Sequence, residues 1–413
     1  RDRVRPGMRA VATLKSRVVT GFVVEVSHES PVADVIPLVD LPDGEPLFDD
    51  AMLRLCRWVA DYYCCAWGEA LQTALPAALR RGAAMVYRLN EAAAEPGRLS
   101  GRQAKVLALL REKGPMTATR LAAAVGGSAL SNTLLALCRR GLVIREIQAR
   151  GGESAVLRRT WAVLVPDALP DAETMARLQR RAPRQAAVLL DLTQREPEQA
   201  ATELVARHGA DLSVLRALEK KGWVRLERRE LFRTPRPADG MPVSARLTLN
   251  PEQEAARRAI TDALDRNAFQ VFLLRGITGS GKTEVYLQVI EHALERGLGA
   301  IILVPEISLT PQTAARFYAR FPGQIAVLHS GLGDGERFDE WRRVRQGQVR
   351  IVVGARSAVF APVRRLGVIV VDEEHDNSYK QADTPRYHGR DVAVVRARLE
   401  RAVCVLGSAT PSL

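Results

Sequence analysis

The sequence of 413 residues has few cysteines and no long apolar run. Its five cysteines are odd in number and form no C-x-x-C pair, so neither a disulfide framework nor a zinc site can be read from them. We expect reduced, mostly buried thiols at Cys56, Cys64, Cys65, Cys138 and Cys404. No apolar run approaches the roughly 20 residues that span a bilayer, and no signal-peptide pattern opens the chain. These absences predict a soluble, cytoplasmic protein with no membrane partner.

Lysine is also scarce, yet the chain is strongly basic. Sixty Lys and Arg against 47 Asp and Glu give a formal net charge of +13, and most of the cations are arginine. This excess favours a polyanionic partner, and arginine suits bidentate contacts with phosphate. A GC-rich genome would also favour arginine over lysine, but it would not produce the net excess. With 47% apolar residues the chain is globular, with room for about three domains of roughly 150 residues.

The first part of the chain predicts two modules of different kinds. Residues 1–95 predict a small mixed α/β domain, because a β-rich stretch at Val18–Val26 precedes a helical pattern at Phe48–Tyr63. Residues 99–150 predict a winged helix, a plan that places its third helix in a major groove. Its helices and the strand that follows them are expected at 101–112, 117–124, 128–140 and 142–147. A helix-turn-helix used only for packing or protein contact is the alternative.

The winged-helix pattern is repeated further along the chain. Residues Leu134, Ala136, Leu137, Gly141 and Val143 recur, in the same order and spacing, as Leu215, Ala217, Leu218, Gly222 and Val224. Residues 151–232 are therefore predicted to hold a second winged-helix-like module. A linker that contains Pro and Arg is expected at 233–246.

Residues 247–413 alternate between short β-branched runs and helical segments. The runs that predict strands are 271–274, 300–304, 325–328, 350–353, 368–371 and 403–406. This alternation is typical of a doubly wound, mostly parallel sheet. The predicted fold class is therefore multidomain α/β, with the winged helices in tandem before the parallel-sheet lobe.

The strongest chemical signal is the segment Gly276–Thr283, which matches the phosphate-binding loop G-x-x-x-x-G-K-[ST] in full. It follows a predicted strand and precedes a predicted helix, so backbone N–H groups and the helix dipole would face the phosphates. The expected ATP ligands are Gly276, Thr278, Gly279, Ser280, Gly281, Lys282 and Thr283. Lys282 should reach the β- and γ-phosphates, and the Thr283 hydroxyl should ligate Mg²⁺.

Two further strand ends complete an ordered set. The run Val368–Val371 is followed by Asp372, Glu373, Glu374 and His375. Asp372 can hold Mg²⁺ there, and Glu373 can orient the attacking water. Ser408, Ala409 and Thr410 follow the last predicted strand. Each signal is weak alone, but after a phosphate-binding loop in the same sheet the set predicts an ATPase.

This ordered set resembles the superfamily 2 helicases, in which the matching Asp-Glu-x-His and Ser-Ala-Thr motifs couple ATP hydrolysis to DNA movement. The stretches Gly276–Tyr286, Leu303–Gln312, Val353–Ala358 and Val371–Asp376 narrow the resemblance to the PriA family of primosomal replication-restart helicases. The segment Trp58–Tyr63, far outside the ATPase region, fits the same family. Another helicase-family translocase would leave that segment unexplained.

The resemblance implies roles for individual residues. It makes Lys282, Asp372, Glu373 and His375 catalytic, with Ser408 and Thr410 coupling hydrolysis to movement. It assigns adenine recognition to Gln253. It further implies DNA contacts in residues that include an aromatic and basic loop, namely Arg356, Tyr379, Lys380, Arg386 and Tyr387. Stacking of the two tyrosines on bases is physically reasonable, and ordinary packing is the alternative.

The resemblance also implies parts that lie outside residues 1–413. Residues 1–95 would be a 3′-DNA-end-binding domain that starts partway in, and residues 247–413 the first RecA-like helicase lobe. A zinc-binding insertion and a second lobe would follow, so this chain holds no zinc ligands and Zn²⁺ is expected only there. Because the second lobe supplies arginines to the transition state, we expect the fragment alone to hydrolyse ATP poorly.

The implied function is that of a replication-restart protein. It would recognise stalled or abandoned forks, remodel them by ATP-dependent 3′-to-5′ unwinding, and promote primosome assembly and replicative-helicase loading. The implied partners are branched and single-stranded DNA, single-stranded DNA-binding protein and helicase-loading proteins, with ATP and Mg²⁺ as cofactors. The alternative is a non-enzymatic fork-recognition scaffold with a vestigial ATPase core.

Overall fold

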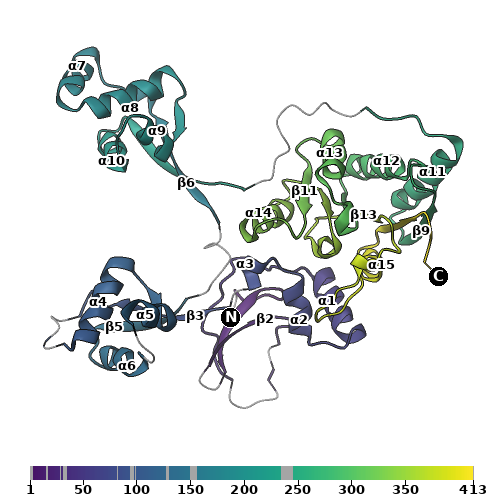
Figure 1. The fold of residues 1–413 in the computed structure, drawn as a ribbon, viewed down its shortest axis with the longest axis horizontal. Coiled ribbons are helices and arrows are strands. Elements are labelled where there is room, and N and C mark those ends of the chain that lie inside the picture. Colours follow the sequence, from purple (N-terminus) through teal and green to yellow (C-terminus); the bar gives the residue numbers. More distant parts are fainter. Residues whose placement is uncertain are drawn as a thin grey trace. The chain divides into compact units, whose positions relative to one another are not determined.

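The chain forms two compact units, residues 1–155 with 235–413, and Val156–Thr234 (Figure 1). The computed structural model describes residues 3–14, 17–27, 29–30, 35–80, 82–93, 97, 99–126, 130–148, 156–233 and 245–412. Most of the linker expected at 233–246 lies outside the described residues. Within the described ranges, no helix has both the length and the apolar character needed to cross a bilayer.

A six-stranded parallel sheet forms the centre of the ATPase lobe, in the order β11-β12-β10-β13-β14-β9. Its strands are β9 (Gln270–Arg275), β10 (Gly299–Leu303), β11 (Ile325–Leu328), β12 (Ile351–Gly354), β13 (Leu366–Val371) and β14 (Val403–Ser408). Each coincides with a run predicted from the sequence, so the predicted parallel sheet is confirmed. Both faces of β10 to β13 are buried, which explains their nearly continuous apolar sequence.

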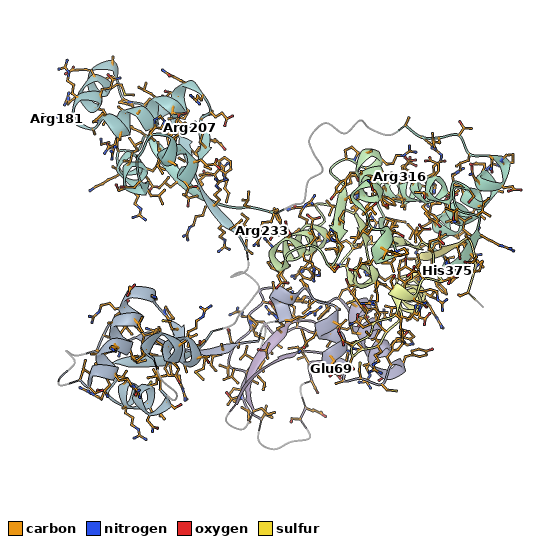
Figure 2. The ribbon with its side chains drawn as sticks, in the orientation of Figure 1. Glu69, Arg181, Arg207, Arg233, Arg316 and His375 are labelled. Carbon is orange, nitrogen blue, oxygen red and sulfur yellow. The ribbon has the colours of Figure 1, made fainter. Side chains whose placement is uncertain are left out.

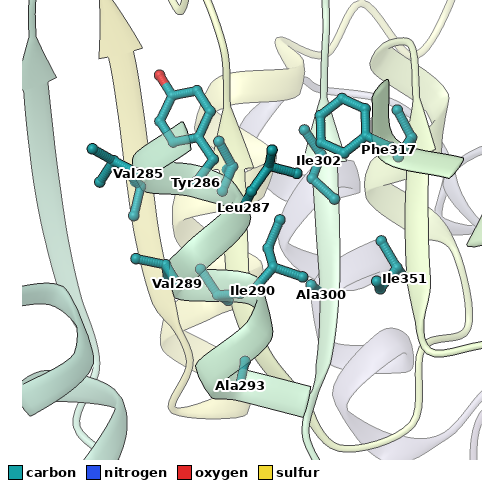
Figure 3. Packing of buried hydrophobic residues seen from close by; sticks show 14 of the residues in the cluster. Val285, Tyr286, Leu287, Val289, Ile290, Ala293, Ala300, Ile302, Phe317 and Ile351 are labelled. Carbon is teal, nitrogen blue, oxygen red and sulfur yellow. The ribbon is translucent and has the colours of Figure 1, made fainter. Parts of the chain in front are cut away.

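Helices cover this sheet, and those on one face share a single apolar core. That core joins α11 (Pro251–Asp265), α12 (Lys282–Glu295) and α13 (Pro311–Arg320) to inward-facing residues of the strands. Figure 3 shows α12 lying against β10, with Ile290 near Ala300. Burying a side chain such as Ile290 stabilises the fold by about 1.5–3 kcal/mol. Outside this cluster, α14 (Asp334–Arg345) packs on β11 and α15 (Gly389–Glu400) packs on β13 and β14.

The N-terminal module is small and mixed in structure. Strands β1 (Arg9–Leu14) and β2 (Arg17–Phe22) form an antiparallel pair, followed by α1 (Asp50–Tyr62), α2 (Trp67–Thr73) and α3 (Ala77–Arg80). Strand β2 ends four residues before the predicted β-rich stretch does. A buried ion pair joins the Arg9 guanidinium to Asp43, at 2.6 Å from Nη2 to Oδ1, and Arg9 Nη1 also donates to the Leu79 carbonyl. These bonds fasten β1 to the loop before α1 and to α3.

The winged-helix module includes a strand that was predicted to belong to the first domain. Its elements are β3 (Ala84–Leu89), α4 (Gly101–Lys113), β4 (Met116–Thr117), α5 (Ala118–Val125), α6 (Ser131–Arg139) and β5 (Val143–Gln148). The boundary placed at residue 95 is therefore wrong, because β3 pairs with both β4 and β5. The composition of residues 90–98, rich in Ala and Glu with one Pro and one Gly, is typical of a linker and favours a boundary after β3 instead of before it. Residues 128 and 129 of the predicted third helix lie outside the described residues.

The second unit repeats this order of elements around a core of its own. It contains β6 (Arg158–Leu164), η2 (Pro166–Ala168), α7 (Ala172–Arg181), α8 (Pro183–Gln194), β7 (Glu198–Ala200), α9 (Ala201–Arg207), α10 (Leu212–Lys220) and β8 (Val224–Glu230). Its sheet order, β7-β6-β8, matches the β4-β3-β5 order of the first module. Helix α7 is an addition between the first strand and the first shared helix. The predicted tandem arrangement is therefore present in the fold.

The cysteines differ from expectation in one respect. All five are free, as predicted, but only Cys56 and Cys404 are buried. Burial raises the pKa of each of these two thiols to about 12, which makes them poor nucleophiles at neutral pH. The expectation that most of the thiols are buried is wrong, because Cys64 is exposed and Cys65 and Cys138 are half-buried.

Candidate nucleotide-binding and coupling site

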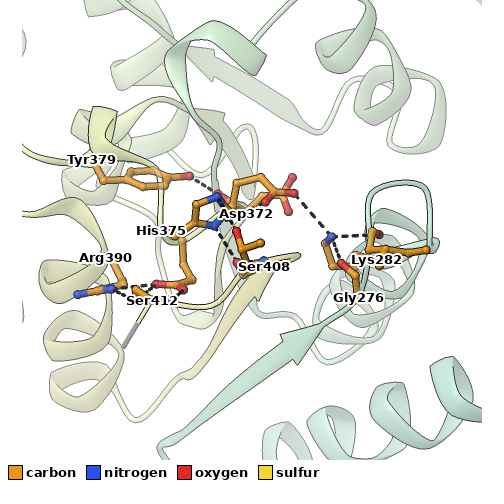
Figure 4. Close-up of polar contacts among 12 residues, drawn as sticks. Gly276, Lys282, Asp372, His375, Tyr379, Arg390, Ser408 and Ser412 are labelled. Carbon is orange, nitrogen blue, oxygen red and sulfur yellow. Dashed lines mark hydrogen bonds and ion pairs between the residues drawn. The ribbon is translucent and has the colours of Figure 1, made fainter.

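The phosphate-binding loop lies between β9 and α12, as the motif requires. Gly279 and Gly281 have φ of +81° and +82°, a left-handed conformation that glycine adopts without strain. Lys282 begins α12, and its Nζ donates to the Gly276 carbonyl at 2.6 Å (Figure 4). The same ammonium lies 3.6 Å from Glu373 Oε1. The loop therefore directs a cation and the first turn of a helix towards the carboxylates that follow β13.

A cavity of about 750 Å³ opens beside this loop. Besides the loop, its lining includes Leu247, Leu287, Arg316, Asp372 and Glu373. Its wall thus combines apolar side chains, which suit a purine base, with cations and N–H groups, which suit phosphates.

The residues at the phosphate end fit a nucleoside triphosphate with Mg²⁺. Ser280 Oγ is buried and has no hydrogen-bond partner among the described residues, and Asp372 supplies a carboxylate beside the loop. Thr283 and Asp372 both line the cavity and would be the side chains to hold Mg²⁺, which would neutralise charge on the phosphate oxygens.

Two tyrosines fix the position of Asp372. Tyr286 of α12 donates from Oη to Asp372 Oδ1 at 3.1 Å, and Tyr379 donates to the Asp372 carbonyl oxygen at 2.6 Å. Burial raises the pKa of Asp372, and the nearby Glu373 raises it further, whereas the hydrogen bond from Tyr286 lowers it. Tyr286 thus helps to keep the carboxylate ionised, the form that binds a metal ion. In the sequence, Tyr286 belongs to the Gly276–Tyr286 motif but has no predicted role.

A glycine makes room for Tyr286. A Cβ atom placed on Gly407 of β14 would lie 1.6 Å from Tyr286 Oη. Glycine at this position is therefore required by the contact between α12 and the end of β13, and not by its own backbone conformation.

His375 brings together the two strand ends that the sequence paired. Its Nδ1 lies 2.7 Å from Ser408 Oγ and 3.8 Å from Glu373 Oε2, and its Nε2 lies 3.3 Å from Thr410 Oγ1. Ser408 Oγ also accepts from the Thr410 N–H at 3.1 Å. The imidazole therefore bridges the carboxylate after β13 and the Ser-Ala-Thr segment after β14, so a change at one can reach the other.

Glu374 makes a second link between the same strand ends. Its carboxylate pairs with Arg390 of α15 at 2.9 Å and accepts from the Ser412 N–H and hydroxyl, each at 2.8 Å. Burial alone would raise the pKa of Glu374, but these bonds lower it. Arg390 and Ser412 were not found from the sequence, because nothing in their local pattern marks them.

Gln253 contacts the loop instead of lining the cavity. Its Nε2 donates to the Ser280 carbonyl at 2.7 Å, and its Oε1 accepts from the Asn250 N–H at 2.9 Å as part of the N-cap of α11. The Gln253 side chain thus supports the phosphate-binding loop through its hydrogen bond to the Ser280 carbonyl. Its assignment to adenine recognition stays a prediction.

The five residues expected to contact DNA divide into two groups. Tyr379 and Tyr387 are fully buried, so neither ring offers a free face for stacking, and the packing alternative describes this structure. Arg356 holds the loop from inside through the Ser378 and Lys380 carbonyls, at 3.0 and 2.5 Å. Only Lys380 and Arg386 have exposed side chains. The loop therefore packs against the ATP site, and the charged side chains of Lys380 and Arg386 are exposed.

The N-terminal module contacts this loop directly. Tyr63 Oη accepts from the His388 N–H at 3.1 Å and donates to Asp391 Oδ2 at 3.4 Å, and Lys380 Nζ lies 5.1 Å from the centre of the Tyr63 ring. Helix α1 packs on α15 beside these contacts. The Trp58–Tyr63 segment, which had no structural explanation in the sequence, thus joins the first module to the loop that holds Asp372.

Comparison with known proteins gives matches to both the N-terminal module and the ATPase lobe. A family model described as a 3′DNA-binding domain matches residues 1–76, and the DEAD/DEAH box helicase model matches residues 250–412. The replication restart protein PriA of Bacillus subtilis (strain 168) is 37% identical over 418 residues, which cover 99% of this chain and 50% of the relative. Over nearly its whole length the chain is therefore similar to the PriA family.

A second relative and a solved structure give the extent of the similarity. PriA of Synechocystis (strain PCC 6803) is 34% identical, over 96% of this chain and 47% of the relative. The chain thus spans about half the length of these curated relatives. A structure of RecG bound to a three-way DNA junction covers 42% of this chain and 24% of that chain, with 22% identity and a TM-score of 0.31, a likeness too weak to indicate a function.

Proposed function

We propose that the protein containing these residues is an ATP-dependent 3′-to-5′ DNA helicase that restarts replication at stalled forks. It uses ATP with Mg²⁺, acts in the cytoplasm on branched and single-stranded DNA, and promotes primosome assembly and helicase loading. Single-stranded DNA-binding protein and helicase-loading proteins are its proposed protein partners. The proposed domains are a 3′-end-binding module, two winged-helix modules and the first helicase lobe.

The observation that carries the proposal is the His375 bridge. An ATP site alone would need only the phosphate-binding loop and two carboxylates. A direct contact from Glu373 through His375 to Ser408 and Thr410 supports an ATP site whose state is passed to the rest of the lobe. The match of residues 1–76 to a 3′DNA-binding domain supports DNA as the substrate.

The test is ATP turnover by the natural gene product that contains these residues, with and without a branched DNA. Lys282→Ala should abolish turnover, because it removes the ammonium that would contact the phosphates, while fork binding stays unchanged. Lys113→Ala, at the exposed end of α4, is the matched control. Normal turnover in Lys282→Ala would disprove the assignment of the ATP site. Tight fork binding without turnover in any variant would favour the scaffold function.

A further inference from the structure

The second unit lies outside the residues matched by either family model, and the ATP site makes no use of it. Its fold nevertheless repeats the winged helix, with α9 and α10 as the helix-turn-helix. Helix α10 then occupies the place of the recognition helix, the element that enters a major groove in DNA-binding proteins of this plan. Leu215 and Leu218 of α10 are buried in the core, so the opposite side of the helix is presented outwards.

Charge is divided unevenly over this unit. Most arginines of its sheet are paired with acids, as in Arg158 with Glu230, Arg225 with Glu227, and Arg229 with Glu198. Among the described residues of this unit, Arg228 of the sheet is exposed and forms no ion pair with a carboxylate, and the same is true of six cations of its helices: Arg180, Arg181, Arg184, Arg216, Lys220 and Lys221. We call these six residues the basic surface.

The basic surface draws its cations from three helices, of which α8 contacts both α7 and α10. Helix α7 ends at Arg181 (labelled in Figure 2) and α8 begins two residues later, so three of the six cations lie at one helix junction. Lys221 Nζ donates to Gln185 Oε1 at 2.8 Å, which brings the end of α10 against the first turn of α8. Arg216 lies one helical turn before Lys220 on the outward side of α10.

The corresponding helix of the first module has a different chemistry at its centre. Leu135 of α6, which is 50% exposed, stands where the repeat places Arg216. The second module thus offers a cation at the middle of its recognition helix, a position suited to phosphates and to the acceptor atoms of guanine.

We propose that the basic surface binds duplex DNA, with α10 in the major groove and the α7–α8 junction against flanking phosphates. Single strands are usually held on exposed aromatic rings, whereas the aromatic ring beside this surface is partly buried and has a cation next to it. Trp223 is half-buried and has Lys221 Nζ 4.9 Å from its ring centre. The start of α8 adds a helix N-terminus on the same side, which favours phosphate. This binding goes beyond the proposed helicase activity and needs no ATP.

The test removes three charges from the basic surface of the full chain: Arg181→Gln, Arg184→Gln and Arg216→Gln. The matched control removes three paired charges from the sheet of the same unit: Arg158→Gln, Arg159→Gln and Arg225→Gln. Fluorescence anisotropy measures binding to a blunt 20-base-pair DNA at several salt concentrations without nucleotide. The first variant should bind about tenfold more weakly at moderate salt, with a salt-dependence slope reduced by about 2 to 3, and the control should bind like the parent.

Equal binding by both triple variants and the parent would overturn the proposal. So would equal weakening by the two triple variants, or tighter binding of duplex RNA or single-stranded DNA through the same three arginines. A photo-crosslinking residue in place of Leu212, on the exposed side of α10, gives a second measurement. It should crosslink to duplex DNA, and the same residue in place of Thr193, at the far end of α8, should not. Neither assay contains ATP. A negative result would therefore contradict the duplex-binding proposal without contradicting the helicase proposal.

Discussion

At the scale of single residues, Tyr286 of the ATP site holds the carboxylate that is proposed to bind Mg²⁺. Replacing Tyr286 with Phe removes the hydrogen bond to Asp372 Oδ1. That bond lowers the pKa of Asp372 against the effect of burial, so its loss should raise the pKa further. A larger fraction of Asp372 would then be protonated as the pH falls, and the affinity for Mg²⁺ would fall with it. We expect the Mg²⁺ concentration for half-maximal ATP turnover to rise several-fold, and more at about pH 6 than at about pH 8.

The measurement is a Mg²⁺ titration of ATP turnover at several pH values. Tyr318→Phe, a tyrosine on α13 instead of α12, is the control and should behave like the parent. An identical pH dependence in Tyr286→Phe and the parent would mean that the hydrogen bond does not tune the carboxylate.

At the scale of elements, α1 of the N-terminal module is joined to the loop that holds Asp372. Tyr63→Phe would leave the His388 N–H and Asp391 without their shared partner while keeping the ring. Because Tyr379 of the same loop donates to the Asp372 carbonyl, loosening the loop should reach the ATP site. We expect DNA-stimulated ATP turnover to fall several-fold while turnover without DNA stays near the parent value.

Tyr62→Phe provides a matched control for this variant. Tyr62 is 62% exposed and stacks on Trp58 at 4.9 Å between ring centres, so it lies beside the contact without taking part in it. The comparison is of turnover with and without DNA in each variant. A proportional loss in both conditions would indicate a role in the stability of the lobe and not in communication.

What the sequence predicts also differs between these scales. The parallel sheet and the phosphate-binding loop are local: β-branched runs mark the strands, and the spacing of Gly276 to Thr283 sets the loop. Contacts of His375 with Ser408 and Thr410 follow from topology, since parallel strands β13 and β14 are neighbours with their carboxyl ends on one edge. The contacts of Tyr63 with Asp391 and of Glu374 with Ser412 join residues that are far apart in the sequence. No local pattern marks them, so only the folded chain reveals them. The burial of Tyr379 and Tyr387 likewise has no local signal in the sequence.

At the scale of the whole molecule, the two units have separate cores and should unfold separately. The second unit holds a buried carboxylate, Asp191, bonded to Gln199, Arg207 and His208. Burial alone would raise the pKa of Asp191, but these bonds outweigh it and lower the pKa to about 2. Since the folded pKa lies below the unfolded value of about 3.9, this stabilisation is complete above about pH 5 and is lost as the pH falls towards 2.

Asp191→Asn should therefore destabilise the second unit by about 2 kcal/mol near neutral pH and remove most of its acid sensitivity between about pH 5 and pH 2. The measurement is calorimetric unfolding of the chain over this pH range, with Asp167→Asn on the exposed η2 turn as the control. A non-hydrolysable ATP analogue identifies the other transition, because a ligand stabilises only the unit that binds it. The analogue should raise the transition of the first unit and leave the Asp191-dependent one in place. A single transition that responds to both the analogue and Asp191→Asn would mean that the two units fold as one, and that the second unit is not an independent module.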